Sequence, residues 1–228
     1  MLSLRYAYLA LDTVFLLFWF FLFLHRKDLR KEMLVSSIMA GVLAVCFEFF
    51  FIKDYWTPIL WNGWAVGLED FLYGFAIGGV ASVVYEEVFK KRFTLKKSHT
   101  HHWRYLFLLY LISLPVFFLA RELLGVNTMY SILGSFIAAF VYIMFLRSDL
   151  WRDALWSGVL FLCITFLAYM PVLVIFPDFI SAFWHLENIS GVLFFGVPLE
   201  EFIWAFTFGL VVGPFYEWWL GMRLKKLL

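Results

Sequence analysis

The chain has 228 residues, of which 64% are hydrophobic and only 15% are charged. A soluble domain of this size cannot bury so much apolar surface, so lipid must cover much of it. The formal net charge of +1 gives no indication of a nucleic-acid partner. The two cysteines, Cys46 and Cys163, lie inside apolar runs and predict no disulfide framework. The composition therefore predicts an integral membrane protein.

Seven apolar segments are long enough to cross a membrane as helices. They are residues 4–24, 33–52, 64–89, 103–123, 128–146, 154–176 and 191–220. With this number of crossings, only Arg5, Lys53 and Arg121 of the 18 Lys and Arg residues lie on one side of the membrane. The side rich in basic residues is cytoplasmic by the positive-inside rule, which predicts an outside N-terminus and a cytoplasmic C-terminus.

An internal repeat relates the third segment to the seventh. Residues 67–87 align with 198–218 without a gap at an offset of 131, and 8 of the 21 aligned positions are identical. A shorter match relates the charged run 26–32 to 147–153 at an offset of 121. These matches predict an all-α membrane fold of seven helices, with two parallel three-helix repeats joined by a linking helix. The predicted units are residues 1–97, the linker 98–127, and 128–228.

Each copy of the longer repeat begins with two adjacent acids, Glu69-Asp70 and Glu200-Glu201. Ionisable side chains are costly at membrane depth, so a duplicated acidic pair indicates a functional site. Adjacent residues on a helix diverge by about 100°, so at most one acid of each pair can point fully at a shared cavity. The other is expected to accept hydrogen bonds or to contact Arg121. A plainer interpretation treats all four acids as interfacial charges at helix starts.

The protonation state of these acids stays open at this point. Burial and repulsion between like charges favour the neutral acid, which can donate a proton to a weak base. The dipole at a helix start instead favours the ionised carboxylate. Asp12 and Glu48 lie in the same half of the membrane and fit a packing role as well as a site. Glu86 and Glu217, at the cytoplasmic ends, are expected to pair with nearby Lys and Arg.

A histidine cluster, His99, His101 and His102, lies in the polar loop between the third and fourth segments. No carboxylate or cysteine stands nearby in the sequence to complete a metal site. A solvated basic loop is therefore the favoured interpretation, and no metal is expected.

The run Pro198-Leu199-Glu200-Glu201 starts the last helix of a duplicated, Phe-rich membrane unit. It resembles the Pro-x-Glu-Glu/Asp motif of the lycopene cyclase domain family. The resemblance implies a carotenoid cyclase that protonates an acyclic isoprenoid end, closes a ring and loses a proton, without net redox change and without a cofactor. Glu69-Asp70 match the first acidic pair of the family and Glu200-Glu201 the second. All four are expected to be catalytic and to line one cavity, with the second pair favoured because Pro198 completes its motif.

Aromatic side chains near the acids can stabilise a cation formed in the same pocket. The expected substrate-binding residues are Phe71, Phe75, Pro198, Phe202, Trp204 and Phe206, and Tyr73 offers a further aromatic face. The resemblance implies a carotenoid or other isoprenoid substrate and the lipid bilayer as partners, with no nucleic acid. The first copy has Gly67 in place of the family's proline, so the ring type and the substrate stay open, as does a homo-oligomeric state.

Other classes of membrane protein fit the same pattern to different degrees. A small transporter or an isoprenoid- or lipid-binding protein, with acids that carry a proton or a cation, fits the repeat and the acids equally well. A retinal-binding protein is excluded because the last segment has no lysine before Lys225 to form a Schiff base. A dinucleotide-dependent cyclase is not supported, because Gly74-x-x-x-Gly78 lies in a membrane helix and indicates close helix packing.

Overall fold

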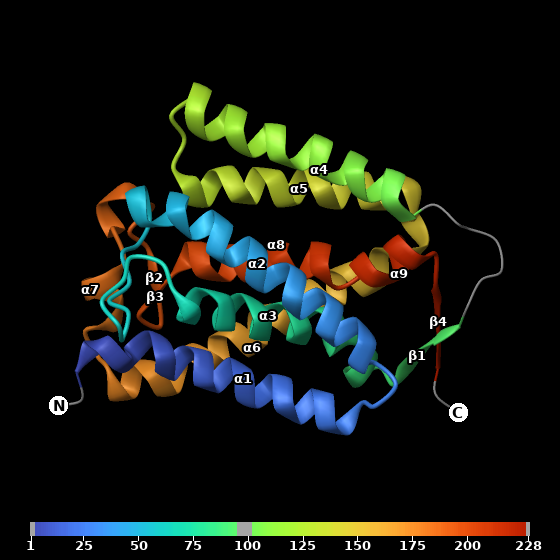
Figure 1. Ribbon diagram of the computed structural model, residues 1–228, viewed down its shortest axis with the longest axis horizontal. Helices are drawn as coiled ribbons and strands as arrows, with labels where there is room; N and C mark the ends of the chain where they lie inside the picture. Colours follow the sequence, from blue (N-terminus) through green and yellow to red (C-terminus); the bar gives the residue numbers. More distant parts are fainter. Residues whose placement is uncertain (1–2, 95–101, 227–228) are drawn as a thin grey trace.

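The computed structural model describes residues 3–94 and 102–226, which form a bundle of helices along one long axis (Figure 1). The longer helices are α1 (Ala7–His25), α2 (Arg30–Asp54), α3 (Leu68–Val88), α4 (His102–Phe118), α5 (Thr128–Leu146), α6 (Trp151–Ile175) and α8 (Leu199–Val212). The shorter ones are α7 (Phe179–Phe183), α9 (Phe215–Leu220), 3-10 turns at Leu4–Tyr6, Ser148–Leu150 and Leu186–Asn188, and a π-helical turn at Leu119–Leu123. The described part of the chain is therefore all-α apart from short strands.

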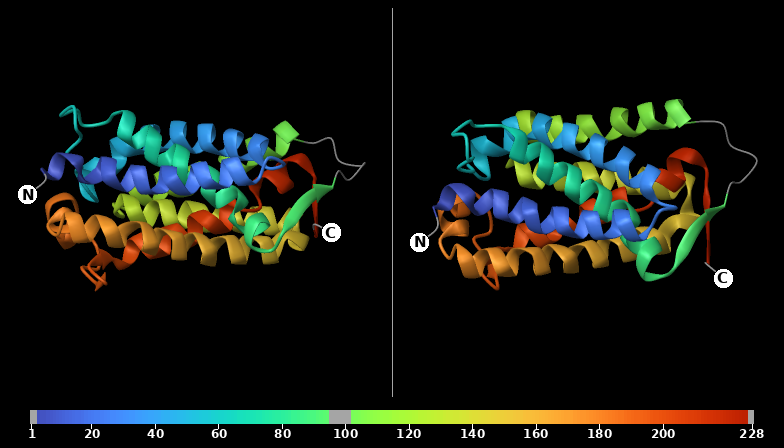
Figure 2. Two further views of the ribbon diagram at one scale, coloured as in Figure 1. Left: turned by 90° about the horizontal axis from the view of Figure 1, so that it is seen from below. Right: turned by 60° about the horizontal axis from the view of Figure 1, so that its bottom comes forward.

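Two short strand pairs mark the two ends of the bundle (Figure 2). Strand β1 (Lys91–Thr94) pairs antiparallel with β4 (Arg223–Lys226) at the end here called the strand end. The opposite end, here called the loop end, carries the hairpin of β2 (Leu193–Phe194) and β3 (Val197–Pro198). Helices α3 and α8 both start at the loop end and run in the same direction (Figure 1).

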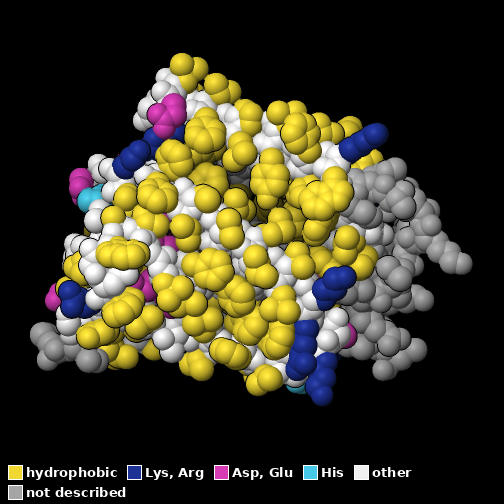
Figure 3. Space-filling view, in the orientation of Figure 1, with side chains coloured by type: hydrophobic (Ala, Val, Ile, Leu, Met, Phe, Trp, Pro, Cys, Tyr) yellow, Lys and Arg dark blue, Asp and Glu magenta, His cyan; other side chains and the backbone are white. Residues whose placement is uncertain are grey.

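Six of the described helices, α1 to α6 with their flanking turns, are long and apolar enough to cross a membrane. Hydrophobic side chains cover the middle of the surface in Figure 3, and charged side chains lie toward its ends. Such a band is the surface that lipid covers. His99, His101 and the predicted unit boundary between residues 97 and 98 lie outside the described residues.

The seventh predicted segment, 191–220, differs from a continuous spanning helix. Its first residues form the β2–β3 hairpin, and the helix is interrupted between α8 and α9 at Gly213-Pro214. Proline has no backbone N–H and cannot continue the helical hydrogen-bond ladder, which explains the break. At 14 residues, α8 is shorter than the roughly 20 residues that a bilayer requires. It packs against α3, α5 and α6, so protein rather than lipid covers much of it.

Glycines allow close helix packing at two corresponding places. A Cβ added to Gly78 of α3 would lie 2.7 Å from the Ser36 backbone oxygen of α2. A Cβ added to Gly209 of α8 would lie 2.7 Å from the Ser157 backbone oxygen of α6. No larger residue permits this approach without a shift of one helix. The serines are 121 positions apart and the glycines 131, which are the two offsets of the sequence repeats.

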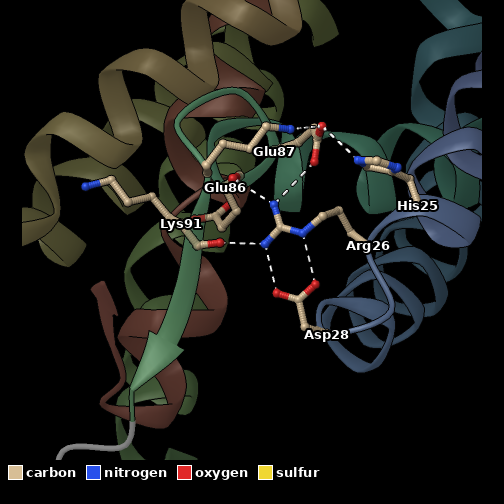
Figure 4. A network of polar contacts seen from close by, with 7 residues as sticks. His25, Arg26, Asp28, Glu86, Glu87 and Lys91 are labelled. Atoms are coloured by element: carbon tan, nitrogen blue, oxygen red, sulfur yellow. Dashed lines mark hydrogen bonds and ion pairs between the residues drawn. The ribbon is translucent and has the colours of Figure 1, made fainter. Parts of the chain in front are cut away.

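Arginine side chains brace the strand end in two matching arrangements. In the first arginine brace, Arg26 binds the Asp28 carboxylate through Nε and Nη2 at 2.9 and 2.8 Å. Its Nη1 donates to the Glu86 backbone oxygen at 2.8 Å, and its Nη2 donates to the Lys91 backbone oxygen. Figure 4 shows this guanidinium group between the α1–α2 turn and the end of α3. The brace therefore fixes the last turn of α3.

The second arginine brace repeats these contacts in the other half of the chain. Arg147 binds the Asp149 carboxylate through Nε and Nη2 at 2.8 and 2.9 Å. Its Nη1 donates to the Glu217 backbone oxygen at 3.1 Å, and its Nη2 donates to the Met222 backbone oxygen at 2.9 Å. Each residue of this brace follows its counterpart in the first brace by 121 or 131 positions.

Candidate active site

A cavity of about 220 Å³ lies inside the bundle, with walls contributed by α1 to α6, α8 and α9. Most of the side chains that line it are apolar or aromatic. Among the described residues, the acidic side chains that line it are Glu48, Asp70 and Glu201. An apolar cavity with a few convergent polar groups is the usual form of a small-molecule site.

The cavity reaches the lipid-facing surface between α2 and α4. Leu43 of α2 lines the cavity and is also 37% exposed, while Leu109 and Ser113 line it from α4. Figure 3 shows a hollow among the hydrophobic side chains on this face of the molecule. An apolar molecule dissolved in the bilayer can therefore approach the cavity from the side.

In each acidic pair, one acid lines the cavity and the other does not. Asp70 and Glu201 line the cavity, whereas Glu69 and Glu200 lie outside its lining. All four side chains are buried, with no more than 6% exposed. Since successive helix residues diverge by about 100°, one acid of each pair faces the cavity and its neighbour does not.

The two acids outside the lining bind the segments that precede their helices. Both carboxylate oxygens of Glu69 accept the Trp61 backbone N–H, at 3.2 Å each. Glu200 Oε1 accepts the Ser190 backbone N–H at 2.9 Å and the Tyr130 hydroxyl at 2.8 Å. These contacts hold the segments around Trp61 and Ser190 against the starts of α3 and α8.

The sequence left open whether the outward acid of each pair accepts hydrogen bonds or contacts Arg121, and the structure shows the hydrogen bonds, while Arg121 has other partners. Its Nε donates to the Thr128 hydroxyl at 2.9 Å, and its Nη1 forms an ion pair with the adjacent Glu122. The π-helical turn that contains Arg121 follows α4 and contains no buried residue. The charge of the cavity acids is therefore not balanced by Arg121.

Glu201 is held by three hydrogen-bond donors. The hydroxyls of Tyr55 and Tyr169 donate to its carboxylate at 2.6 and 2.9 Å, and Trp184 Nε1 donates at 3.1 Å. Tyr55 and Trp184 lie on two loop-end segments that an antiparallel bridge between Trp56 and Trp184 joins. Donors of this kind fix the orientation of a carboxylate and stabilise its charge.

Asp70 has a different environment, rich in other acids. Its Oδ2 accepts the Gly67 backbone N–H at 2.7 Å and so caps the start of α3. Glu48 and Asp12 both interact electrostatically with Asp70, and Tyr8 interacts with all three acids. Neighbouring carboxylates repel one another, and protonation of one of them relieves the repulsion. Asp70 thus belongs to an acid cluster, whereas Glu201 belongs to a cluster of neutral donors.

Aromatic rings stack along the cavity wall beside the two acids. The ring centroids of Tyr73 and Trp204 are 6.3 Å apart with an interplanar angle of 23°, and those of Trp204 and Phe208 are 5.0 Å apart at 15°. All three side chains line the cavity. Tyr73 follows Asp70 by three positions, and Trp204 and Phe208 follow Glu201 by three and seven, so helix periodicity puts each ring on the face of its acid.

Of the six substrate-binding residues expected from the sequence, only Trp204 is among the residues that line this cavity. Phe71 packs on Gly41, Phe75 on Trp19, Phe202 on Phe166 and Phe206 on Gly158, while Pro198 pairs with Leu193 in the hairpin. These five residues therefore support the helices and the hairpin around the cavity. Phe208, Tyr55, Tyr169 and Trp184 were not expected from the sequence.

Glu86 and Glu217 were expected to pair with nearby Lys and Arg, and no such pair forms among the side chains that the structure describes. Both are 0% exposed, and neither carboxylate has an ion-pair partner among the described residues. With Asp153 they form a group of acids at the strand end, away from the cavity lining. The nearby arginines bind the backbone oxygens of Glu86 and Glu217 instead of their carboxylates.

Comparison with known proteins gives one family. A family model described as lycopene cyclase matches residues 5–88 and 127–219. The first matched region holds α1 to α3 and the second holds α5 to α8 and most of α9, so that β1 and α4 fall between them. No curated protein and no solved structure matches the chain. Both acidic pairs lie in the matched regions.

Proposed function

Because the chain belongs to the lycopene cyclase family, we propose that it closes a ring at the acyclic end of a lycopene-type carotenoid without net redox change. The observation that carries this proposal is the cavity wall, where Asp70 and Glu201 accompany a row of aromatic rings in an otherwise apolar space. The apolar wall suits the end of a polyene, and the lateral opening suits a substrate that is dissolved in the bilayer.

The proposed proton donor is Asp70, acting together with Glu48. Several acids that share a cluster retain a proton more readily than an isolated acid, because ionising all of them would bring like charges together. A neutral acid in an apolar site can protonate a carbon–carbon double bond at the end of the polyene. The resulting cation is attacked by a neighbouring double bond of the same molecule, which forms the ring bond and moves the positive charge into the ring.

The proposed partner of the cation is Glu201. Its carboxylate, oriented by Tyr55, Tyr169 and Trp184, stabilises the positive charge and accepts the proton that leaves the ring. The face of Trp204 adds a cation–π contact of roughly 0.5–2 kcal/mol. One proton enters the substrate from Asp70 and one leaves it to Glu201, so the step needs no oxidant or reductant. The sequence alone favoured the second pair, whereas this assignment takes one acid from each pair.

The orientation in the membrane is a further part of the proposal. The loop end, with the cavity acids, faces the outside, and the strand end, with both arginine braces, faces the cytoplasm. Single cysteines at Asn62 and Ser148, in a background without Cys46 and Cys163, test this by labelling in intact cells. The orientation would be wrong if a membrane-impermeant reagent labelled Ser148→Cys and not Asn62→Cys.

We also propose that α1 to α3 and α5, α6 and α8 are parallel repeats, with α4 as the linker. The paired glycine contacts and the two arginine braces support this, because each pair obeys the sequence offsets. An experimental structure tests the proposal directly. Failure of α1 to α3 to superpose on α5, α6 and α8 would contradict it.

Pigment analysis tests the proposed activity and separates it from a transporter or a lipid-binding protein. The chain is expressed in a host that accumulates lycopene, and the carotenoids are separated by chromatography. The wild-type chain is expected to convert lycopene to a ringed product, and Asp70→Asn and Glu201→Gln are expected to lose most of this conversion. Wild-type protein that is present in the membrane and leaves lycopene unchanged would reject the cyclase and favour the alternative.

A further inference from the structure

Four buried acids meet at the strand end, away from the cavity. They are Glu32 of α2, Glu86 of α3, Asp153 of α6 and Glu217 of α9, and their exposed fractions are 1%, 0%, 3% and 0%. One carboxyl oxygen from each of Glu86, Asp153 and Glu217 lies within 4.8 Å of the others. Glu32 interacts electrostatically with all three of these acids. We refer to these four residues as the strand-end acid cluster.

Few hydrogen-bond donors reach the oxygens of this cluster among the side chains that the structure describes. Both carboxyl oxygens of Glu32 are buried without a partner, as is Oδ2 of Asp153, and Glu86 and Glu217 have only each other's carboxyl groups as side-chain hydrogen-bond partners. Ser157 donates to Asp153 Oδ1 at 3.2 Å. A buried carboxylate without a donor or a cation is strongly unfavourable. The unsatisfied oxygens of Glu32 are a separate observation from the grouping of the other three acids, and they point to the same missing positive partner.

The nearby cationic side chains that the structure describes do not supply that partner. The guanidinium groups of both arginine braces donate to the backbone oxygens of Glu86 and Glu217 and to Asp28 and Asp149. The braces therefore hold the ends of the helices that carry two of the acids and leave the carboxylates themselves unpaired. Arg26 and Lys91 act on the cluster only at longer range, through electrostatic attraction to Glu32 and Asp153 respectively.

We propose that the strand-end acid cluster binds one hard divalent cation, of the class of Mg²⁺, Mn²⁺ or Ca²⁺. Such ions take carboxylate oxygens as ligands, and the grouped oxygens of Glu86, Asp153 and Glu217 offer three of them, with the Glu32 carboxyl group nearby. Zinc and softer metals are disfavoured because the cluster contains neither histidine nor cysteine. The bound ion ties α2 and α3 to α6 and α9, and so joins the two halves of the chain at the end opposite the cavity.

The sequence repeats contain the same four positions. Glu32 and Asp153 are 121 positions apart, and Glu86 and Glu217 are 131 positions apart. Each half therefore supplies one acid from its second helix and one from the end of its third. The two equivalent pairs of acids therefore meet where the two halves of the chain join.

Binding of Mn²⁺ to the purified full-length chain tests the proposal. The protein in detergent is stripped with a chelator, and free Mn²⁺ is then followed by electron paramagnetic resonance during a titration at neutral pH without carotenoid. We expect one saturable Mn²⁺ per chain, displaced by excess Mg²⁺ or Ca²⁺. Glu86→Gln/Glu217→Gln should lower the affinity by at least about a hundredfold, because it removes two ligands. The control Glu122→Gln, an exposed acid at the loop end, should bind as the wild type does.

The competing explanation is that the acids share protons among themselves and bind no cation. Absence of saturable Mn²⁺ binding by the wild type would establish that explanation and overturn the proposal. Equal binding by wild type and Glu86→Gln/Glu217→Gln would place the ion elsewhere and also overturn it. If the double variant does not remain monodisperse, Glu32→Gln alone is expected to weaken binding at least about tenfold, and unchanged affinity would count against the site. The titration does not measure cyclase activity, so its result tests the cation site independently of the proposed roles of the cavity acids.

Discussion

Replacement of Asp70 by Asn separates the chemical role of this acid from its structural one. Asn has nearly the same size and keeps an oxygen that can accept the Gly67 N–H, so the cap of α3 is retained. A lost cap would cost about 1 kcal/mol, and a retained one should cost less. The lost proton donor should reduce the rate by about 10²–10⁴-fold, which corresponds to about 2.7–5.4 kcal/mol in the activation barrier. Activity should therefore fall far more than stability.

The assay is the initial rate of ring formation by purified protein with lycopene in lipid nanodiscs, together with the thermal midpoint of each variant. The matched control is Glu69→Gln, which neutralises the adjacent acid outside the cavity lining. We expect this control to retain a rate within about tenfold of the wild type, the loss reflecting a weakened contact with Trp61. Near-normal activity of Asp70→Asn beside an inactive Glu69→Gln would refute the assignment of roles within the pair.

Three further substitutions test the site and the packing. Tyr169→Phe removes one of the three hydrogen bonds to the Glu201 carboxylate. This change should slow ring formation by about one to two orders of magnitude, because a hydrogen bond to a charged group is worth about 1.5–3 kcal/mol. An unchanged rate would count against an ionised Glu201. Trp204→Leu should slow the same reaction by about 2–30-fold through loss of a cation–π contact of roughly 0.5–2 kcal/mol. Gly209→Ala should lower the free energy of unfolding by about 1–3 kcal/mol, because the new Cβ meets backbone at 2.7 Å. Gly134→Ala, where the nearest atom is 3.6 Å away, should be neutral or stabilising in the same thermal melt, and equal losses for both glycines would contradict the packing argument.

Helix periodicity and the repeat agree with part of the geometry around the cavity. The duplicated acids located the starts of α3 and α8, and the 100° step between neighbours predicted that one acid of each pair faces away from the cavity. The same step explains why several of the aromatic residues expected to bind substrate lie outside the cavity lining. Phe71 and Phe202 follow the cavity acids directly and so point away, whereas Tyr73 lies on the cavity face.

Contacts between distant segments could not be predicted in the same way. Tyr55 lies 146 positions from Glu201, and nothing in the local sequence distinguishes it from the many other aromatic residues of a membrane chain. Trp184 reaches the same carboxylate because an antiparallel bridge joins its segment to Trp56. The pairing of these two loop segments depends on the packed tertiary structure, and the sequence around each segment does not predict it.

The strand-end acids differ from the simplest expectation. Glu86 and Glu217 were expected to pair with the Lys and Arg residues that follow them closely in the sequence, and both are buried. The repeat already contained the contrary signal, since both glutamates are identical between copies and Glu32 and Asp153 match at the second offset. At this end of the bundle, Arg26 and Arg147 donate hydrogen bonds to the backbone oxygens of Glu86 and Glu217, while the two carboxyl groups are buried.

The most direct test of the central claim is ring formation in D₂O. Asp70 and Glu48 exchange their protons for deuterons before lycopene is added, and the product is analysed by mass spectrometry. If a protein acid starts the reaction, each ring that forms carries one deuterium in a non-exchangeable position, and Asp70→Asn forms labelled rings about 10²–10⁴-fold more slowly. Wild-type rings that form without deuterium, or labelled rings that form at the wild-type rate in Asp70→Asn, would contradict the assignment of Asp70 as the proton donor.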